Sequence, residues 1–191
     1  MITLYHGTSK TIAKKAIKAG ILPRGTQGSN WEKYPSNNDM VYLTDTYPIY
    51  FAVAAVPEDE LDELAMIEVQ VDEDNLYPDE DFLSQLVKAR EKRLPESEEA
   101  IELQMINKDL WKSSLEHLGN VAHKGSVRPE CIKRIWTLNS KDKRHILLIA
   151  AAMDPVISVM NKRFCGDKYQ ELIEEIKREG KIMFDESGGK K

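Results

Sequence analysis

The stretch Leu4-Tyr5-His6-Gly7-Thr8-Ser9, near the start of the 191-residue chain, decides how the rest of the sequence is interpreted. Its apolar and polar residues alternate as they do in a β-strand. Glycine has no Cβ, so a ligand can approach both the imidazole of His6 and the bare backbone amide of Gly7. The hydroxyls of Thr8 and Ser9 are candidates to cap a following helix or to bind the same ligand. The stretch predicts a strand that ends in a ligand-binding turn, although such an ending is also common where no ligand binds.

A second stretch of the same kind is Met40-Val41-Tyr42-Leu43-Thr44-Asp45. Tyr42 alternates with two apolar neighbours, so its ring is expected to face away from them. A tyrosine in this position can face a ligand, but strands favour aromatic residues in any case. The run Pro48–Val56 predicts a short apolar helix that carries Tyr50 and Phe51. We expect His6 and Tyr42 to face one shared pocket.

Together these motifs resemble the ADP-ribosyltransferase superfamily, in particular its His-Tyr-Glu branch, which includes diphtheria-type toxins and poly-ADP-ribose polymerases. Within residues 1–60 the resemblance also rests on the turn Ala19-Gly20-Ile21-Leu22 and on Tyr50-Phe51-Ala52. The phrase Gly125-Ser126-Val127-Arg128-Pro129-Glu130-Cys131-Ile132 is similar to a connection that closes many bacterial and phage members of the superfamily. The resemblance therefore extends, with gaps, to residue 139.

The resemblance implies an α+β fold with a split, mixed β-sheet. We expect a catalytic domain over residues 1–139, interrupted by a helical excursion over 72–118, and a helical C-terminal extension over 140–191. The acidic and mixed charge runs of the excursion are typical of a solvated surface. The C-terminal helices are expected to pack on the back of the sheet or to dock a partner protein. The resemblance implies that the loop Pro23–Asp39, with Trp31 and Tyr34, borders a dinucleotide; the alternative is a flexible connection whose two aromatic residues only anchor it to the core.

The resemblance also implies how NAD would be held. His6 would bind a hydroxyl of the adenosine-side ribose, and the Gly7 backbone would bind the nicotinamide amide. Tyr42 would stack on the nicotinamide ring, with Tyr50 or Phe51 as the opposite wall. Such stacking contributes about 0.5–1.5 kcal/mol beyond area burial, so it positions the ring and does not drive the reaction. The expected NAD-binding residues are His6, Gly7, Thr8, Tyr42, Thr44, Tyr50 and Phe51.

The reaction that the resemblance implies also needs a negatively charged side chain near the ribose. Breaking the nicotinamide–ribose bond produces a ribosyl cation-like transition state, which a nearby negative charge stabilises. Glu116 is the nearest glutamate ahead of the closing connection, so the expected catalytic residues are His6, Tyr42 and Glu116. Asn120 and His123, on the predicted strand, are alternatives. A competing interpretation of Glu116 is an exposed helical acid that pairs with Lys112.

The composition bounds the class of protein. The 27 Lys and Arg residues against 32 Asp and Glu residues give a net charge of −5, so no global basic field indicates nucleic acid or membrane as a partner. Cys131 and Cys165 give neither a metal-ligand spacing nor a disulfide framework, and we expect no metal. The longest apolar run, Ile146–Met153, is too short to span a bilayer, and no leader sequence is visible. The expected location is the cytoplasm, without membrane contact.

The expected function is an NAD-dependent ADP-ribosyltransferase that modifies a macromolecule, of the small bacterial or phage-defence toxin type. The region between Lys108 and Arg144 is locally basic, which favours RNA or DNA slightly over protein as the acceptor. An antitoxin protein is a further expected partner. One alternative is an RNA 2′-phosphotransferase, whose additional N-terminal winged helix has no room in this chain. The other is a catalytically inactive module of the same fold that binds a nucleotide or a partner.

Overall fold

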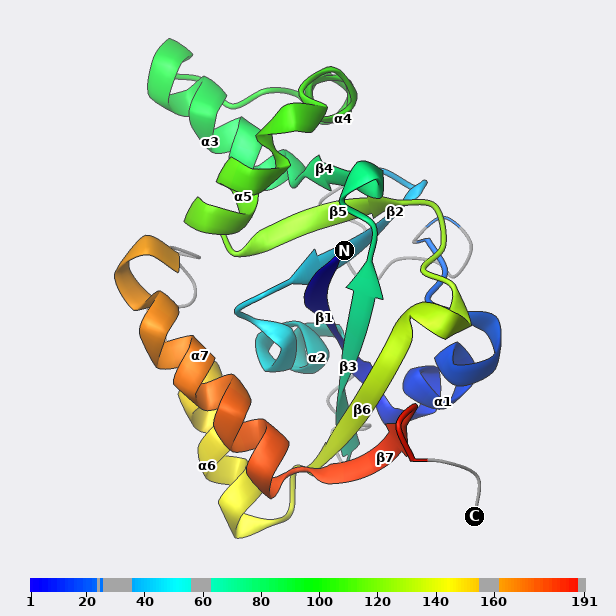
Figure 1. The fold of residues 1–191 in the computed structure, drawn as a ribbon. Coiled ribbons are helices and arrows are strands. Elements are labelled where there is room, and N and C mark those ends of the chain that lie inside the picture. Colours follow the sequence, from blue (N-terminus) through cyan, green and yellow to red (C-terminus); the bar gives the residue numbers. More distant parts are fainter. Residues whose placement is uncertain (24, 26–35, 56–62, 155–161, 189–191) are drawn as a thin grey trace.

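The strands of the protein form one seven-stranded sheet in the order β4-β5-β2-β1-β3-β6-β7 (Figure 1). The computed structural model describes residues 1–23, 25, 36–55, 63–154 and 162–188, with the side chains of residues 164 and 165 excluded. The strands are β1 (Ile2–Ser9), β2 (Met40–Thr44), β3 (Glu63–Val71), β4 (Leu76–Pro78), β5 (Asn120–Lys124), β6 (Ile132–Asn139) and β7 (Lys181–Asp185). Each neighbouring pair in this described sheet is antiparallel. The expected α+β class is confirmed, whereas the expectation of a mixed sheet is wrong, because no two neighbouring described strands run parallel.

The helices surround this sheet in separate groups (Figure 1). They are α1 (Lys10–Ala19), α2 (Pro48–Ala55), α3 (Glu80–Glu91), α4 (Ser97–Ile106), α5 (Trp111–His117), α6 (Lys143–Ala152) and α7 (Lys162–Glu179). Helices α3, α4 and α5 gather beside β4, while α6 and α7 lie side by side on another flank. Short 3₁₀ turns occur at η3 (Glu73–Asn75), η4 (Lys108–Leu110) and η5 (Pro129–Cys131). Within the described segments, no helix combines the length and apolar character that crossing a membrane requires.

Local hydrogen bonds explain where α1 begins and ends. The Ser9 hydroxyl accepts from the N–H of Ile12 at 3.2 Å, which satisfies one of the free donors at the start of the helix. Gly20 ends the helix with a φ of 78°, a conformation that glycine adopts without strain. The N–H of Gly20 donates to the carbonyl of Ala16 at 2.8 Å. The helix thus starts directly after β1 and stops at the turn that the sequence predicts.

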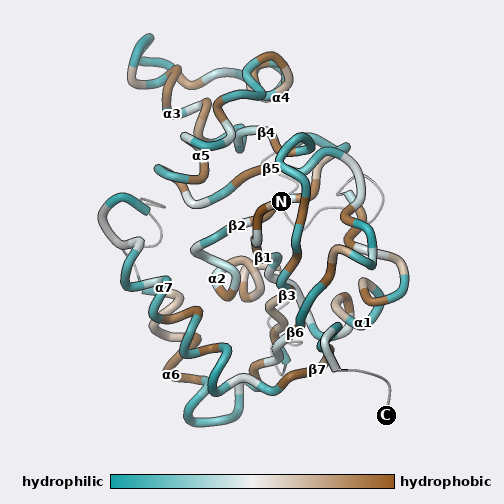
Figure 2. The backbone as a smooth tube through the Cα atoms, in the orientation of Figure 1, coloured by the Kyte–Doolittle hydropathy of each residue, from teal (hydrophilic) through white to brown (hydrophobic). Residues whose placement is uncertain are grey.

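Two hydrophobic clusters lie on the two faces of the sheet. Leu4 and Ile67 belong to the cluster that also includes Ala13 of α1. Tyr5 and Met66 belong to the other cluster, to which α2, α6 and α7 contribute. Adjacent residues of a strand point to opposite faces, so each central strand supplies both clusters. Figure 2 shows hydrophobic colour along much of β3 and at the start of β1, and a mixed pattern along α7.

Two strands lie in regions that were expected to be helical or loop-like. β4 falls inside the excursion expected over 72–118, and β7 falls inside the helical extension expected over 140–191. β7 pairs with β6, and Tyr169 and Ile173 of α7 are buried in a sheet cluster. The C-terminal segment is therefore part of the same sheet and core. β4 was missed because three residues, one of them a proline, are too few to show a strand alternation.

Candidate functional site

The candidate site lies where β1 and β2 stop pairing. β1 pairs with β3 along its whole length, from Ile2 to Ser9, but its register with β2 consists of the single pair Tyr5↔Thr44. Beyond that pair, β1 continues through His6 and Gly7 without a further register partner on β2. Backbone N–H and C=O groups need hydrogen-bond partners, so unpaired strand edges can bind a polar ligand. The motif His6-Gly7 stands at this point of divergence.

The imidazole of His6 is held by the backbone of β2. Nδ1 of His6 lies 3.0 Å from the carbonyl oxygen of Tyr42. A carbonyl only accepts, so Nδ1 carries the proton and donates. Burial lowers the pKa of His6, and this effect exceeds the raising effect of the hydrogen bond to Tyr42. A neutral ring in this tautomer has Nε2 as a hydrogen-bond acceptor.

His6 and Tyr42 leave the sheet on opposite faces. Tyr5 and Thr44 are direct partners, so their side chains share a face. Tyr42 is two residues from Thr44, so it lies on the same face as Thr44 and Tyr5. His6 directly follows Tyr5, so its side chain lies on the opposite face. The ring of His6 meets the backbone of Tyr42 and not its phenol. The expectation that His6 and Tyr42 face one shared pocket is therefore wrong, because strand alternation puts their side chains on opposite faces of the sheet.

The phenol of Tyr42 is part of a buried group of polar residues that we call the Glu80 cluster: Asn37, Tyr42, Glu80 and Gln104. The Tyr42 hydroxyl donates to the Glu80 carboxylate, whose oxygens lie at 2.7 and 2.8 Å. The same hydroxyl accepts from the N–H of Asn37 at 3.1 Å. Nε2 of Gln104 donates to Glu80 at 2.9 Å, and Nδ2 of Asn37 donates to Gln104 at 3.0 Å. Four residues from β2, α3, α4 and the segment before β2 are thus joined in one network, and the side chain of Ser36 also forms a hydrogen bond with Glu80.

Burial sets the electrostatics of this cluster. It raises the pKa of Glu80, and the hydrogen bond from Tyr42 opposes that change. It also raises the pKa of Tyr42, with the nearby Glu80 charge as the next cause. Asp79 and Asp81 beside it likewise have pKa values raised by burial. The result is a group of acids that lose protons less readily than in water.

The start of β5 lies against the end of β2. Asn120 pairs directly with Thr44, and both are buried. The Thr44 hydroxyl donates to the carbonyl of Gly119 at 2.6 Å. The Ser114 hydroxyl donates to the carbonyl of Asn120 at 2.8 Å and accepts from the N–H of Asp79 at 3.0 Å. These contacts fix the first residue of β5 to both β2 and the helical excursion.

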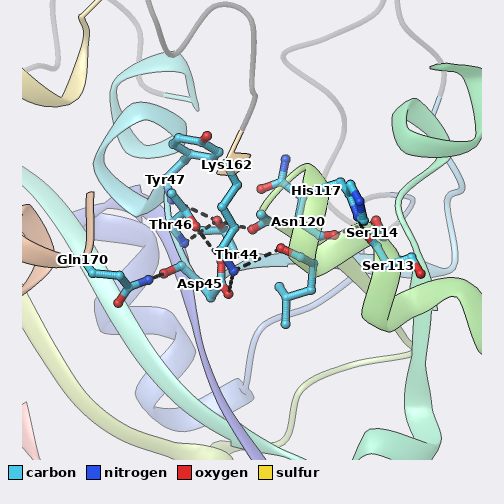
Figure 3. A network of polar contacts seen from close by, with 12 residues as sticks. Thr44, Asp45, Thr46, Tyr47, Ser113, Ser114, His117, Asn120, Lys162 and Gln170 are labelled. Atoms are coloured by element: carbon cyan, nitrogen blue, oxygen red, sulfur yellow. Dashed lines mark hydrogen bonds and ion pairs between the residues drawn. The ribbon is translucent and has the colours of Figure 1, made fainter. Parts of the chain in front are cut away.

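A second polar group, which we call the Asp45 cluster, consists of Asp45, Thr46, Lys162 and Gln170 (Figure 3). The Asp45 carboxylate forms an ion pair with Lys162 of α7 and accepts from the Thr46 hydroxyl at 2.5 Å. Lys162 also donates to the carbonyl of Leu115 at 3.1 Å, and Gln170 donates to the backbone of Asp45 at 2.7 Å. The cluster joins the end of β2 to α5 and α7.

The remaining predicted residues are spread around these strands. Glu116 is exposed on α5, one turn before β5. His123 is buried on β5, where burial lowers its pKa. Thr8 is buried in β1. Tyr50 and Phe51 of α2 contact each other edge to face at 5.3 Å and pack against the core cluster that includes α7.

Gly7 has a packing reason to be glycine. A Cβ at this position would lie 1.8 Å from the carbonyl oxygen of Pro48 and 2.6 Å from the nitrogen of Ala52. Because both are backbone atoms of α2, a side chain would force the helix to move. The absence of a Cβ therefore lets α2 dock on β1, and α2 occupies the space that the sequence analysis left open for a ligand. Trp31 and Tyr34 of the expected binding loop lie outside the described residues.

Sequence reasoning missed Glu80, Gln104 and Lys162. Glu80 stands between two other acids in the run Asp79-Glu80-Asp81, which is typical of an exposed helix start. Asp79 does cap α3, accepting from the N–H of Asp81 at 2.8 Å. The signal for the cap was present, but nothing in the pattern distinguishes the buried acid from its neighbours.

The arrangement provides hydrogen-bonding groups and not a metal centre. No group of three or more His, Cys, Asp or Glu side chains in the described segments is arranged to hold a metal ion. What β1, β2 and β5 present is a neutral imidazole, an oriented phenol and an amide. These suit the binding of a polar ligand that carries hydroxyls and an aromatic ring.

The chain has partial similarity to two solved structures. One is titled CARDS toxin, nicked, with 12% identity and a TM-score of 0.41 over 72% of this chain and 25% of that chain. The other is EcPltA, with 10% identity and a TM-score of 0.40 over 75% of this chain and 79% of that chain. No protein-family model and no curated protein matches the sequence. These similarities assign no activity, so a function has to be argued from the residues of this chain.

Proposed function

We propose that the protein is an NAD-dependent ADP-ribosyltransferase, which transfers ADP-ribose from NAD to a macromolecular acceptor. The observation that carries the proposal is the meeting of three sequence segments on the neighbouring strands β5, β2 and β1. They bring Asn120, Tyr42 and His6-Gly7 to the middle of one sheet. Two of these segments, on β1 and β2, carry the closest motif resemblance to the ADP-ribosyltransferase superfamily.

The residues present fit the polar groups of NAD. Neutral His6, with Nδ1 donating to the Tyr42 carbonyl, would accept from a ribose hydroxyl through Nε2. The backbone of Gly7 would bind the nicotinamide amide, which offers both a donor and an acceptor. Tyr42 would supply an aromatic face for the nicotinamide ring. In this proposal the adenosine-side ribose meets His6 and the nicotinamide ring meets Tyr42, near the point where β1 and β2 stop pairing.

The reaction breaks the bond between C1′ of the ribose and the nicotinamide nitrogen, and the electron pair leaves with neutral nicotinamide. A lone pair of the acceptor forms the new bond to C1′, and the acceptor loses a proton to solvent. The protein contributes positioning and charge stabilisation. Of the three candidates for this charge, Glu116 alone is a carboxylate, so the proposal retains it, with Asn120 and His123 as alternatives.

One observation favours a catalytically inactive binding module as the second candidate. The β5 position opposite Thr44 holds the amide of Asn120 and not a carboxylate. An amide orients a ligand by hydrogen bonds but supplies no negative charge to a developing cation. Nucleotide binding without turnover is the outcome that this candidate predicts.

The test is incubation of the purified protein with NAD labelled in the adenosine part, in the presence of cell extract. Label on RNA, DNA or protein supports transfer, with nucleic acid expected ahead of protein. Nicotinamide release with the label in free ADP-ribose, and none on a macromolecule, indicates hydrolysis. Loss of a 2′-phosphate from RNA indicates the phosphotransferase alternative. Binding of NAD without turnover would contradict the proposal and support the inactive module.

His6→Ala is the decisive variant, with His117→Ala as the matched control. Nδ1 of His117 also lies near a backbone carbonyl, that of Ser113 at 2.9 Å, but His117 is exposed on α5. Loss of one hydrogen bond to a ribose hydroxyl is expected to lower kcat/KM by roughly 10- to 100-fold. The control is expected to retain wild-type turnover. Equal turnover by His6→Ala and wild type would contradict the assigned role.

A further inference from the structure

We propose that Glu80 is a positioning residue of the NAD site, because its carboxylate fixes the phenol of Tyr42 and links it to the helical excursion. This inference rests on the proposed function, since it assigns a purpose to the fixed orientation of Tyr42. Glu80 is the first residue of α3, in a part of the chain whose sequence is typical of solvated surface. It is nevertheless 7% exposed and in contact with the strand that carries Tyr42.

The hydrogen bonds leave the Tyr42 hydroxyl little freedom. It donates to Glu80 at 2.7 and 2.8 Å and accepts from the N–H of Asn37 at 3.1 Å. A phenol hydroxyl has one proton to give, and here that proton is directed at a carboxylate, which makes a strong, charge-assisted hydrogen bond. The ring is thus held at both ends, by the β2 backbone and by its hydroxyl. Its stacking face has a defined orientation before any ligand binds.

Glu80 is in turn held by a residue of another helix. Nε2 of Gln104 donates to Glu80 and to the carbonyl of Pro78, both at 2.9 Å. Gln104 is completely buried, and its Oε1 accepts from Asn37. Asn37 stands at the end of the segment that leads into β2. The carboxylate therefore has a fixed position set by β4, α4 and the approach to β2.

If Glu80 had only a structural role, an uncharged residue would fill the same space with a smaller desolvation penalty. Burying a carboxylate is costly, and none of the ion pairs of the described residues involves Glu80. Replacing buried ionic groups by apolar ones of similar volume is often neutral or stabilising. A carboxylate differs from such replacements in accepting several hydrogen bonds in fixed directions. Here the hydrogen bonds of the carboxylate include those with Tyr42, Gln104 and Ser36.

Because the Tyr42 ring is already oriented, we expect the protein to bind NAD more tightly than a variant in which the ring is free to move. A ring that is already oriented loses less side-chain freedom when it stacks on the nicotinamide. Releasing the hydroxyl should therefore raise the KM for NAD more than it lowers kcat. The chemistry at C1′ would proceed once the ring is in place, because Tyr42 positions the ring and does not supply the charge.

The experiment compares Glu80→Gln, Tyr42→Phe and the double variant in NAD turnover, with Glu102→Gln as the control. Glu102 is exposed on α4, in the same excursion. We expect each of the first two variants to raise the KM for NAD by about 10-fold, with kcat changed by less than about 3-fold. The double variant should be no worse than Tyr42→Phe, because both changes remove the same hydrogen bond. The control should match wild type.

Two outcomes overturn the inference. An unchanged KM in Tyr42→Phe would show that the hydroxyl contact has no positioning role. If Glu80→Gln fails to fold, Tyr42→Phe still tests the inference, because it removes the hydroxyl and keeps the ring. Additive effects of the two changes would show that they act independently. Failure of the proposed function is distinguishable, because wild-type protein would then show no NAD turnover, whereas failure of this inference alone leaves wild-type turnover intact.

Discussion

Glu80 and Asp45 are two carboxylates that hold the same short strand, β2, by different means. Glu80 is 7% exposed and accepts from the neutral donors of Tyr42 and Gln104. The Asp45 side chain is 21% exposed and forms an ion pair with Lys162. Glu80 reaches β2 from the helical excursion, whereas Lys162 reaches it from the C-terminal helix α7. The middle of β2 is thus fixed by buried hydrogen bonds and its end by a partly solvated ion pair.

This difference determines how much each carboxylate should matter. A buried carboxylate has lost its hydration, so each donor it keeps is costly to remove. A partly exposed ion pair retains much of its hydration, and its net contribution is small. The Glu80 cluster should therefore dominate both the stability and the geometry of β2. The Asp45 cluster should adjust them only slightly.

The largest expected effect is that of Glu80→Ala. The change leaves the Tyr42 hydroxyl and one Gln104 hydrogen bond without their acceptor in a buried site. We expect the free energy of unfolding to fall by about 3 kcal/mol. Denaturant unfolding at neutral pH measures this loss. Asp45→Ala, the counterpart in the other cluster, should cost less than about 1 kcal/mol. Equal losses would contradict the view that burial separates the two carboxylates.

A smaller effect should appear in the pH dependence of stability. Burial raises the pKa of folded Glu80 above its ordinary value of 4.5. Between the unfolded and folded pKa values the folded state holds the proton that the unfolded state has lost, so stability falls as pH rises through this window. Glu80→Gln removes this titration, and its unfolding free energy should fall less steeply with rising pH above 4.5.

The neighbouring acids also contribute to the pH dependence of the free energy of unfolding. Asp79 and Asp81 of the same helix start also have raised pKa values, and the Tyr42 hydroxyl faces Glu80 from β2. These two aspartates remain in Glu80→Gln, so a residual slope of the same sign is expected. If wild type and Glu80→Gln have the same slope, Glu80 is not the group that titrates. Unfolding midpoints measured from pH 4 to pH 8 provide the comparison.

The sequence was informative about β2 itself and about the elements that carry its motif. The strand Met40–Thr44 lies within the predicted stretch Met40–Asp45, and the helix that starts at Lys10 ends at Ala19, directly before the turn at Gly20. The helix α2, Pro48–Ala55, is also close to its predicted range, Pro48–Val56. Such elements have strong local signals, because periodicity and end residues are encoded within a few positions.

The contacts that fix β2 from a distance were not predictable in the same way. Glu80 and Gln104 are separated from Tyr42 by 38 and 62 positions, and their meeting depends on how α3 and α4 pack beside β4. An acidic run is usually solvated, so composition indicated the wrong environment for Glu80. Lys162 reaches Asp45 only because α7 returns along the sheet. Tertiary packing, and not local pattern, brings these groups to the candidate site.

A third, smaller effect concerns Lys162. Lys162→Gln removes the ion pair with Asp45, and we expect a loss of unfolding free energy below about 1 kcal/mol at low salt. The loss should shrink in 1 M salt, where the screening length is about 3 Å. The loss caused by Glu80→Gln should not change with salt, because no mobile ion reaches a buried hydrogen bond. A salt-independent loss in Lys162→Gln would show that its contact with the Leu115 carbonyl outweighs the ion pair.

The smallest effect on stability is expected for Glu116→Gln, which replaces a third carboxylate that belongs to neither cluster. Glu116 is exposed on α5, so the change should alter the free energy of unfolding by less than about 0.5 kcal/mol. That makes the variant a clean probe of chemistry, because any fall in NAD turnover cannot be attributed to misfolding. If Glu116 supplies the negative charge, kcat should fall by roughly 100-fold or more while the KM for NAD stays within about 3-fold. Unchanged kcat would remove Glu116 from the catalytic set and direct attention to Asn120, for which Asn120→Asp would then be the informative change.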